Sequence, residues 1–516
     1  MKVYTSIVKN AAEDIAKIYS ETYANLEENI SELRKIFEEH FSRLRENVHL
    51  LIETDYVDKM HRDIYYHYYS TKLDEYPRNC IRVSLFNKPI TEDIFLETTE
   101  TKKVRDNNDF LGFYVFRPTF PNLIGRNVIS PKALRKEYNN FKTCTTCFST
   151  TANGVKFDVI GFPHTSQDGE MIKCAEVTIW ELMEYFGNKY PEYSTVTPSK
   201  ILNTLKNITF ERQLPSRGLP VELLSYALKE FGFAPKIFSE EKYKADDFKK
   251  LFSCYVESGI PIVVCIEGDM GKSVHAILCT GHENEDFGNY IVYVKENLKK
   301  ESNNVKIFDW DSLDKNFVFI DDNSPAYQIA PFNKPVNYIM DAKVIHFIVP
   351  LYTKVYLDAH EVKSQIKKII LERDLFYLAP DWDDNIIIRT FLTSGRSYKQ
   401  YIVQNSKIHV NLKHIINKLN FPKFVWICEL SHLELVNSQE INGLIILDAT
   451  EPGITKHKSL ILITNSTRVA YKENGKMIEE NIGECEEFKD ENGTIQKKCL
   501  PLQPFSRFES NIKAFN

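Results

Sequence analysis

Residues 166–187 read SQDGEMIKCAEVTIWELMEYFG, and a cysteine stands in this stretch where a helix is expected to begin. Four apolar residues recur after it at helical spacing, which predicts an amphipathic helix that ends near Gly187. These residues are Ile179, Leu182, Met183 and Phe186. A thiol at a helix N-terminus lies at the positive end of the helix dipole, next to unpaired backbone N–H groups, and both favour the thiolate. Cys174 is therefore a candidate nucleophile.

A thiol nucleophile needs a base within reach, and the chain offers two histidines for this role. His275 lies in the apolar β-type run 273–281, which follows a second such run at 260–266 across a short loop with glycine. This pattern predicts a hairpin with the histidine on its second strand. His282 is the competing base; it stands at the exit of the same strand beside charged residues, and we expect it to be solvated.

The base needs an orienting partner, and the oxyanion needs hydrogen-bond donors. The predicted strand 317–320 ends in Asp321, Asp322 and Asn323, and each of these could hold the second ring nitrogen of the histidine. We favour Asp321 because it directly follows the strand. Gln167 precedes the cysteine by seven residues and could donate its side-chain amide to the oxyanion, together with the backbone N–H of the cysteine.

This order of residue types resembles the papain-like fold, and within it the bacterial relatives of the bacteriocin-leader-processing (double-glycine) peptidases. The resemblance covers roughly residues 151–345. It rests on Gln167, Cys174-Ala175, Gly259-Ile-Pro261, His275-Ala276 and the segment Asp321-Asp-Asn-Ser-Pro325. Two features depart from the family pattern. Alanine follows the cysteine where glycine is usual, and the interval from glutamine to cysteine is one residue longer than in papain.

The resemblance implies an α+β fold and an intracellular cysteine peptidase acting on a specific protein or peptide. In it Cys174 would attack an amide carbonyl, His275 would transfer the proton, Asp321 would orient His275, and Gln167 would help to bind the oxyanion. The same residues would support thiol acyl transfer to an amine, as in transglutaminases. A catalytically inactive sensor or scaffold is the other alternative, and a bacterial defence or regulatory system is one setting that the resemblance suggests. We expect no cofactor and no metal.

The length of the chain, 516 residues, predicts several domains. We expect a long-helix and α/β module at 1–150, a papain-like peptidase domain at 151–345, and an α/β recognition or partner-binding module at 346–516. Within the first, apolar residues at steps of three and four predict one long helix from Ala11 to Leu51. This helix either packs on its own domain or forms the seam of a homodimer.

Composition excludes several classes of function. The formal net charge of −6 argues against a dominant nucleic-acid-binding surface. The N-terminus lacks the pattern of a secretory signal, no apolar run is long enough for a membrane span, and the ten cysteines read as mostly free thiols. We therefore expect a soluble cytoplasmic protein without a membrane or nucleic-acid partner. A phosphate-binding loop at 268–273 is also rejected, because the pattern's first glycine would fall on Ile266 and a strand follows.

Overall fold

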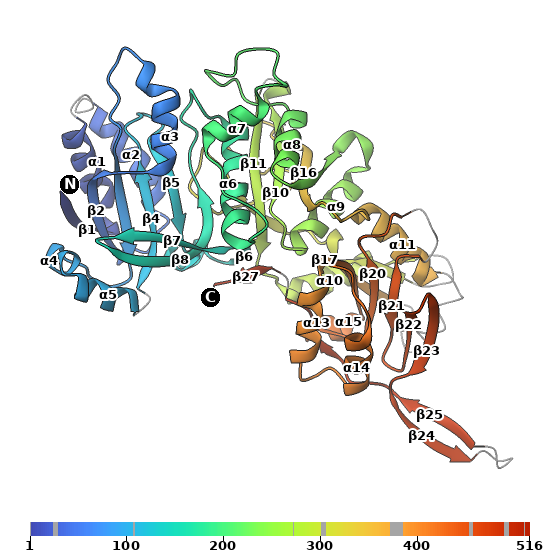
Figure 1. The fold of residues 1–516 in the computed structure, drawn as a ribbon. Helices are drawn as coiled ribbons and strands as arrows, with labels where there is room; N and C mark the ends of the chain where they lie inside the picture. Colours follow the sequence, from blue (N-terminus) through green and yellow to red (C-terminus); the bar gives the residue numbers. More distant parts are fainter. Residues whose placement is uncertain are drawn as a thin grey trace.

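The computed structural model describes residues 2–23, 29–106, 109–271, 273–300, 306–371, 385–453, 458–489, 495–509 and 511–515. Helices and strands combine in an α+β fold with three main sheets, which follow one another in chain order from left to right in Figure 1. The α+β class predicted from the sequence is confirmed. Among the described residues, no helix is both long enough and apolar enough to cross a membrane.

The first sheet has seven antiparallel strands in the order β1-β2-β3-β4-β5-β8-β7. Its strands are β1 (Val3–Ile7), β2 (His49–Tyr56), β3 (Cys80–Phe86), β4 (Phe110–Phe116), β5 (Ile124–Ile129), β7 (Thr146–Ala152) and β8 (Val155–His164). The accompanying helices are α1 (Ala11–Thr22), α2 (Ile30–Phe41), α3 (Lys59–His67), α4 (Glu92–Leu96) and α5 (Thr98–Asp106).

The single long helix predicted from Ala11 to Leu51 is wrong. The chain forms two helices, α1 and α2, that pack against each other, and by Leu51 it has already entered β2. Leu33 and Phe37 of the predicted seam are fully buried in the chain's own core. Both helices turn an apolar face toward one core, so their shared period hides the break between them. A homodimer through this seam stays a prediction, without support from these buried side chains.

The second sheet has the strand order β15-β14-β11-β10-β16-β9 with antiparallel neighbours. Two further strands pair beside it, β6 with β11 and β27 with β6. The strands are β6 (Phe141–Cys144), β9 (Phe233–Ser239), β10 (Ile262–Gly268), β11 (Ser273–Glu283), β14 (Asn316–Ile320), β15 (Gln328–Pro331), β16 (Lys343–Tyr352) and β27 (Ile512–Ala514). Its helices are α6 (Cys174–Lys189), α7 (Pro198–Leu205), α8 (Val221–Glu230) and α9 (Ala245–Glu257). The predicted hairpin is confirmed as β10 and β11, and the rejected phosphate-binding loop is the turn between them.

Helix α6 is more deeply buried than an amphipathic helix, so that prediction is wrong. It runs past Gly187, and besides its apolar residues it buries Glu176, Thr178 and Glu181. Each of these polar side chains has a hydrogen-bond partner: Glu176 accepts from the Ser216 hydroxyl, and Glu181 accepts from a backbone N–H. Buried polar groups are tolerated only with such partners. The helix is therefore a central element of the core, packed against β11, β8, α7 and α8.

The third sheet has the order β12-β13-β17-β18-β20-β21-β22-β23, antiparallel except for the parallel pair β13 and β17. Its strands are β12 (Lys299–Lys300), β13 (Lys306–Asp309), β17 (Asn385–Ser394), β18 (Phe424–Ser431), β20 (Gly443–Asp448), β21 (Leu460–Thr464), β22 (Arg468–Glu473) and β23 (Lys476–Asn481). The helices are α10 (Phe287–Asn297), α11 (Ala359–Leu371), α13 (Gly395–Gln404), α14 (Val410–Lys418) and α15 (Leu433–Asn437). Two small strand pairs complete the fold: β19 (Glu440–Ile441) with β26 (Phe505–Ser506), and β24 (Glu484–Lys489) with β25 (Ile495–Leu500).

The sheets do not divide at residues 150 and 345. Strand β8 completes the first sheet beyond residue 150, while β6 joins the second. Strands β12 and β13 reach forward into the third sheet, and β16, which the sequence assigns to the last module, lies between β10 and β9 in the second. One apolar core also extends from α1 and α2 through α6 to β11. The three-module division stays a prediction, and the cysteine helix lies at the centre of the molecule.

Candidate active site

Cys174 is the first residue of α6, as the sequence predicts, and its side chain is half-buried. The Glu176 carboxylate accepts the backbone N–H of Lys173, which closes the helix start. The hydroxyl of Thr178 donates to the carbonyl of Cys174 at 2.7 Å and lies 3.3 Å from the carbonyl of Ala276 on β11. Thr178 thus joins the first turn of the helix to the strand that carries His275.

The loop before the cysteine is held by buried polar groups. One oxygen of Asp168 accepts the backbone N–H groups of residues 170–172 at 2.8–2.9 Å. The buried guanidinium of Arg117 donates to the carbonyls of Ser166 and Gln167, at 3.0 and 3.1 Å. These contacts fix the backbone on both sides of the turn. The direction in which the chain enters α6 is therefore set by the first sheet, which supplies the arginine.

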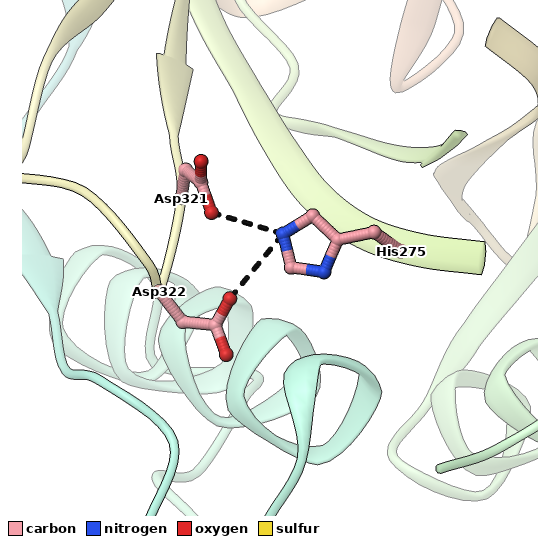
Figure 2. A group of neighbouring side chains, drawn as sticks. All are labelled: His275, Asp321 and Asp322. Atoms are coloured by element: carbon pink, nitrogen blue, oxygen red, sulfur yellow. Dashed lines mark hydrogen bonds and ion pairs between the residues drawn. The ribbon is translucent and has the colours of Figure 1, made fainter. Parts of the chain in front are cut away.

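His275 lies on β11, and one of its ring nitrogens faces two carboxylates at the end of β14, as Figure 2 shows. Its Nε2 is 2.9 Å from Oδ1 of Asp321 and 3.4 Å from Oδ1 of Asp322. The Cys174 side chain lies close enough to the same imidazole to contribute to the rise of its pKa. Because Nε2 is turned to the carboxylates, Nδ1 is the nitrogen left for the sulfur. The fold therefore brings together three residues that are far apart in the sequence.

Hydrogen bonds determine the charges of this group. Burial opposes charge on His275, but hydrogen bonds with Asp321 and Cys174 and the charges of both aspartates raise its pKa well above the usual range. Burial also opposes charge on Asp321, but the hydrogen bond and charge of His275 lower its pKa, and the Asn323 N–H and Tyr338 hydroxyl add to this effect. Asp321 is thus held as a carboxylate and His275 as an imidazolium.

Asp322 has a different environment from its neighbour. It is only 3% exposed, and neither carboxylate oxygen accepts a hydrogen bond of normal geometry within the described residues. Burial raises its pKa to about 7, and the charge of Asp321 adds to this rise. The charge of His275 and the backbone N–H groups of Asp322 and Gln167 act in the opposite direction and offset only part of the rise. Of the three candidates for orienting the histidine, Asp321 makes the shortest contact, whereas Asn323 Nδ2 lies 3.4 Å from Nε2.

Gln167 lies on the carboxylate side of the histidine. Its Nε2 donates to Oδ1 of Asn323 at 2.9 Å, and Asn323 is in turn next to His275. In the described part of the chain the Gln167 amide is therefore hydrogen-bonded to Asn323, and Asn323 lies between it and the imidazole. The oxyanion role of Gln167 stays a prediction, and it requires the amide to leave Asn323.

His282 is not solvated, so that expectation is wrong. It is 1% exposed, and its Nε2 lies 3.4 Å from a carboxylate oxygen of Glu257 on α9. Burial and the charge of Lys315 lower its pKa to about 4. Helix α9 and the third sheet cover this end of the strand, which the local sequence does not indicate. His282 belongs to a buried ion-pair network and not to the site of Cys174.

Tyr338 is a site residue that sequence reasoning missed. Its hydroxyl lies 3.0 and 2.9 Å from the two oxygens of Asp321, and its ring meets that of His275 edge-on at 6.1 Å between centroids. It stands in a loop without a periodic pattern, seventeen residues after the aspartate. No local signal in the sequence could have found it, because only the folded loop brings it to the carboxylate.

Replacing Tyr338 by phenylalanine is expected to slow acylation of Cys174 by a small active ester such as p-nitrophenyl acetate. The expected effect is about five-fold, or about 1 kcal/mol, because a donor to the ionised Asp321 is lost. Water replaces part of the lost bond, since Tyr338 is 51% exposed. Tyr356→Phe, at another exposed tyrosine, is the control and should leave the rate unchanged. Equal rates in both variants would exclude a positioning role.

Comparison with known proteins identifies no family: no protein-family model matches the chain, and no curated protein is significantly similar to it. The function must therefore be argued from the site itself.

Proposed function

We propose that the chain is a cysteine peptidase with a papain-like core, in which Cys174 is the nucleophile. The observation that carries the proposal is that a thiol at the start of a helix lies beside His275, whose other ring nitrogen is 2.9 Å from Asp321. A charged imidazole and a helix N-terminus both favour the thiolate. A carboxylate on the far nitrogen keeps the ring oriented and stabilises its charge. These are the groups that nucleophilic catalysis by a thiol needs.

In the proposed reaction the Cys174 thiolate attacks the carbonyl carbon of a peptide bond. The imidazolium of His275 then gives its Nδ1 proton to the leaving amine, which breaks the C–N bond and leaves a thioester. Water enters, loses a proton to Nδ1 and attacks the thioester, which releases the acid and restores the thiolate–imidazolium pair. Asp321 stays ionised throughout and holds Nε2. The backbone N–H of Cys174, at the free end of the helix, is the first donor we assign to the oxyanion.

The partial exposure of Cys174 allows a peptide or protein substrate to reach the nucleophile from solvent. Cys174 is partly exposed, whereas His275 and Asp321 are 6% and 2% exposed. The nucleophile thus meets the solvent while its partners are protected from water, which strengthens their interaction.

The test is a comparison of protein termini in cells that express the wild-type chain or Cys174→Ala. We expect new N-termini only with the wild-type chain, because cleavage needs the sulfur. Cys147→Ala is the matched control, since it removes an exposed thiol elsewhere and should give the wild-type pattern. If the wild-type chain and Cys174→Ala accumulate equally and yield the same termini, the peptidase proposal is overturned.

A further inference from the structure

We propose that His275, Asp321 and Asp322 form a binding site for one divalent transition-metal ion, with Zn²⁺ as the natural candidate. The three side chains offer one nitrogen and two oxygens that all lie within 4.8 Å of one another. Figure 2 shows both carboxylates approaching the same nitrogen. In tetrahedral zinc sites such ligands lie about 2.0–2.2 Å from the metal, and hence about 3.3 Å from each other. The distances from Nε2 to the two carboxylates, 2.9 and 3.4 Å, lie on either side of that value.

A second, independent observation also points to a ligand, and it concerns the carboxylate of Asp322. This carboxylate is buried, with Oδ1 3.4 Å from Nε2 of His275, yet neither oxygen accepts a hydrogen bond of normal geometry within the described residues. Burial of a carboxylate without such partners is unfavourable. The thiol mechanism does not use this side chain, because Asp321 already orients the histidine. A metal ion bound on the Nε2 side of the ring would give Asp322 a closer partner than the imidazole, which lies 3.4 Å away.

Two carboxylates that face one imidazole suit a dication. Glu181 is buried near them, but burial and the charges of the two aspartates raise its pKa well above the usual range, so it adds no charge to the cluster. His275 is the one cation that contacts both aspartates among the described residues. Ca²⁺ and Mg²⁺ prefer six or more oxygen ligands, whereas imidazole combined with carboxylates suits Zn²⁺ or Co²⁺. Tyr338 covers the cluster and is itself half-exposed, so the ligands lie one side chain below the solvent.

The metal would control the proposed thiol chemistry. Binding at Nε2 releases the Nε2 proton to solvent and leaves a neutral imidazole whose remaining proton is on Nδ1. That ring has no free nitrogen to take a proton from water during hydrolysis of the thioester, while the charge of the ion replaces that of the lost proton. We therefore infer that the ion inhibits the site reversibly. This consequence rests on the proposed function, while metal binding itself does not.

The test is a titration of the full chain with Co²⁺, whose absorption bands distinguish nitrogen and oxygen ligands from thiolate. We expect one equivalent to bind to wild-type and Cys174→Ala chains alike, without a thiolate-to-cobalt charge-transfer band. Asp322→Asn and Asp322→Ser should both weaken this binding by at least about ten-fold. Both should fold, because the replaced oxygens accept no hydrogen bond of normal geometry within the described residues and His275 keeps its shorter contact with Asp321. Asp314→Asn, at a side chain 80% exposed, is the control with unchanged affinity.

Two results would overturn the metal site. One is that Co²⁺ does not bind, or binds only with the thiolate-to-cobalt charge-transfer band. The other is that Co²⁺ binds to the wild-type chain and to both Asp322 variants with equal affinity. The inhibitory role has a separate readout. Zn²⁺ should slow the turnover of p-nitrophenyl acetate at Cys174 in the wild-type chain but not in Asp322→Asn. If Co²⁺ binds as expected and Cys174 is unreactive even without metal, the proposed peptidase fails while the metal site stands.

Discussion

Replacing His275 by alanine is expected to slow acylation of Cys174 by p-nitrophenyl acetate by about two to four orders of magnitude, the range that a positioned proton-transfer group contributes. The physical reason is that the thiol lies beside an imidazole whose raised pKa gives it the positive charge that favours a thiolate. Release of p-nitrophenolate under single-turnover conditions measures this step directly. Its rate does not depend on the natural substrate.

The control is His67→Ala, because this histidine is half-exposed on α3. It should acylate at the wild-type rate. His275→Gln tests whether a loss of rate comes from misfolding, since it fills more of the buried space and its thermal unfolding can be compared. Wild-type rates in a folded His275→Ala or His275→Gln chain would contradict the assignment of the base.

The second large effect concerns stability, and it arises in the buried ion-pair network around Glu257. This residue is 1% exposed at the end of α9. Its carboxylate pairs with the ammonium of Lys315, lies 3.2 Å from Arg389 of β17 and 3.4 Å from His282 of β11. Arg389 in turn lies 2.9 Å from Glu429 of β18. The network therefore joins the second sheet to the third through one buried carboxylate.

Glu257→Ala is expected to lower the free energy of unfolding by about 3–5 kcal/mol, because it leaves Lys315 and Arg389 buried with too few negative partners. Burial opposes charge on Glu257, but Lys315, His282 and Arg389 hold its pKa well below the usual range. Its stabilising effect is thus present above the unfolded pKa of about 4.3 and is lost as the pH falls below it. Urea unfolding at pH 7 and at pH 4 measures both expectations.

The matched control is Asp314→Ala, which removes an acid next to Lys315 in the sequence but at a position that is 80% exposed. Its pair with Lys249 lies at the surface, so the free energy of unfolding should change by less than about 0.5 kcal/mol. Similar losses in Glu257→Ala and Asp314→Ala would show that the buried network contributes nothing special to stability.

The sequence was most informative where local pattern determines structure. The helix start at Cys174, the strand with His275 and the strand end at Asp321 all follow from periodicity over a few residues, and their predicted positions are confirmed. The predicted helix up to Leu51 failed because two helices that face one core have the same period. Local pattern gives no information on which segments meet in space.

Long-range contacts explain the rest of what the sequence did not reveal. Tyr338 contacts Asp321 through an irregular loop, and His282 is covered by α9 and the third sheet. Neither burial nor a partner of this kind is encoded near the residue itself. Asp322 is a further case. Its place at the end of a strand was predicted, but only the fold shows that its carboxylate is buried and accepts no hydrogen bond of normal geometry within the described residues.

The central claim is that Cys174 and His275 act as one unit, and peptide-resolved alkylation by iodoacetamide at pH 6 tests it most directly. In the wild-type chain Cys174 should react at least about ten-fold faster than Cys147, an exposed thiol whose pKa burial and Asp158 raise. In His275→Ala this advantage should disappear, while the rate at Cys147 stays constant. Equal rates at both cysteines in the wild-type chain, or an advantage that survives the loss of His275, would contradict the account.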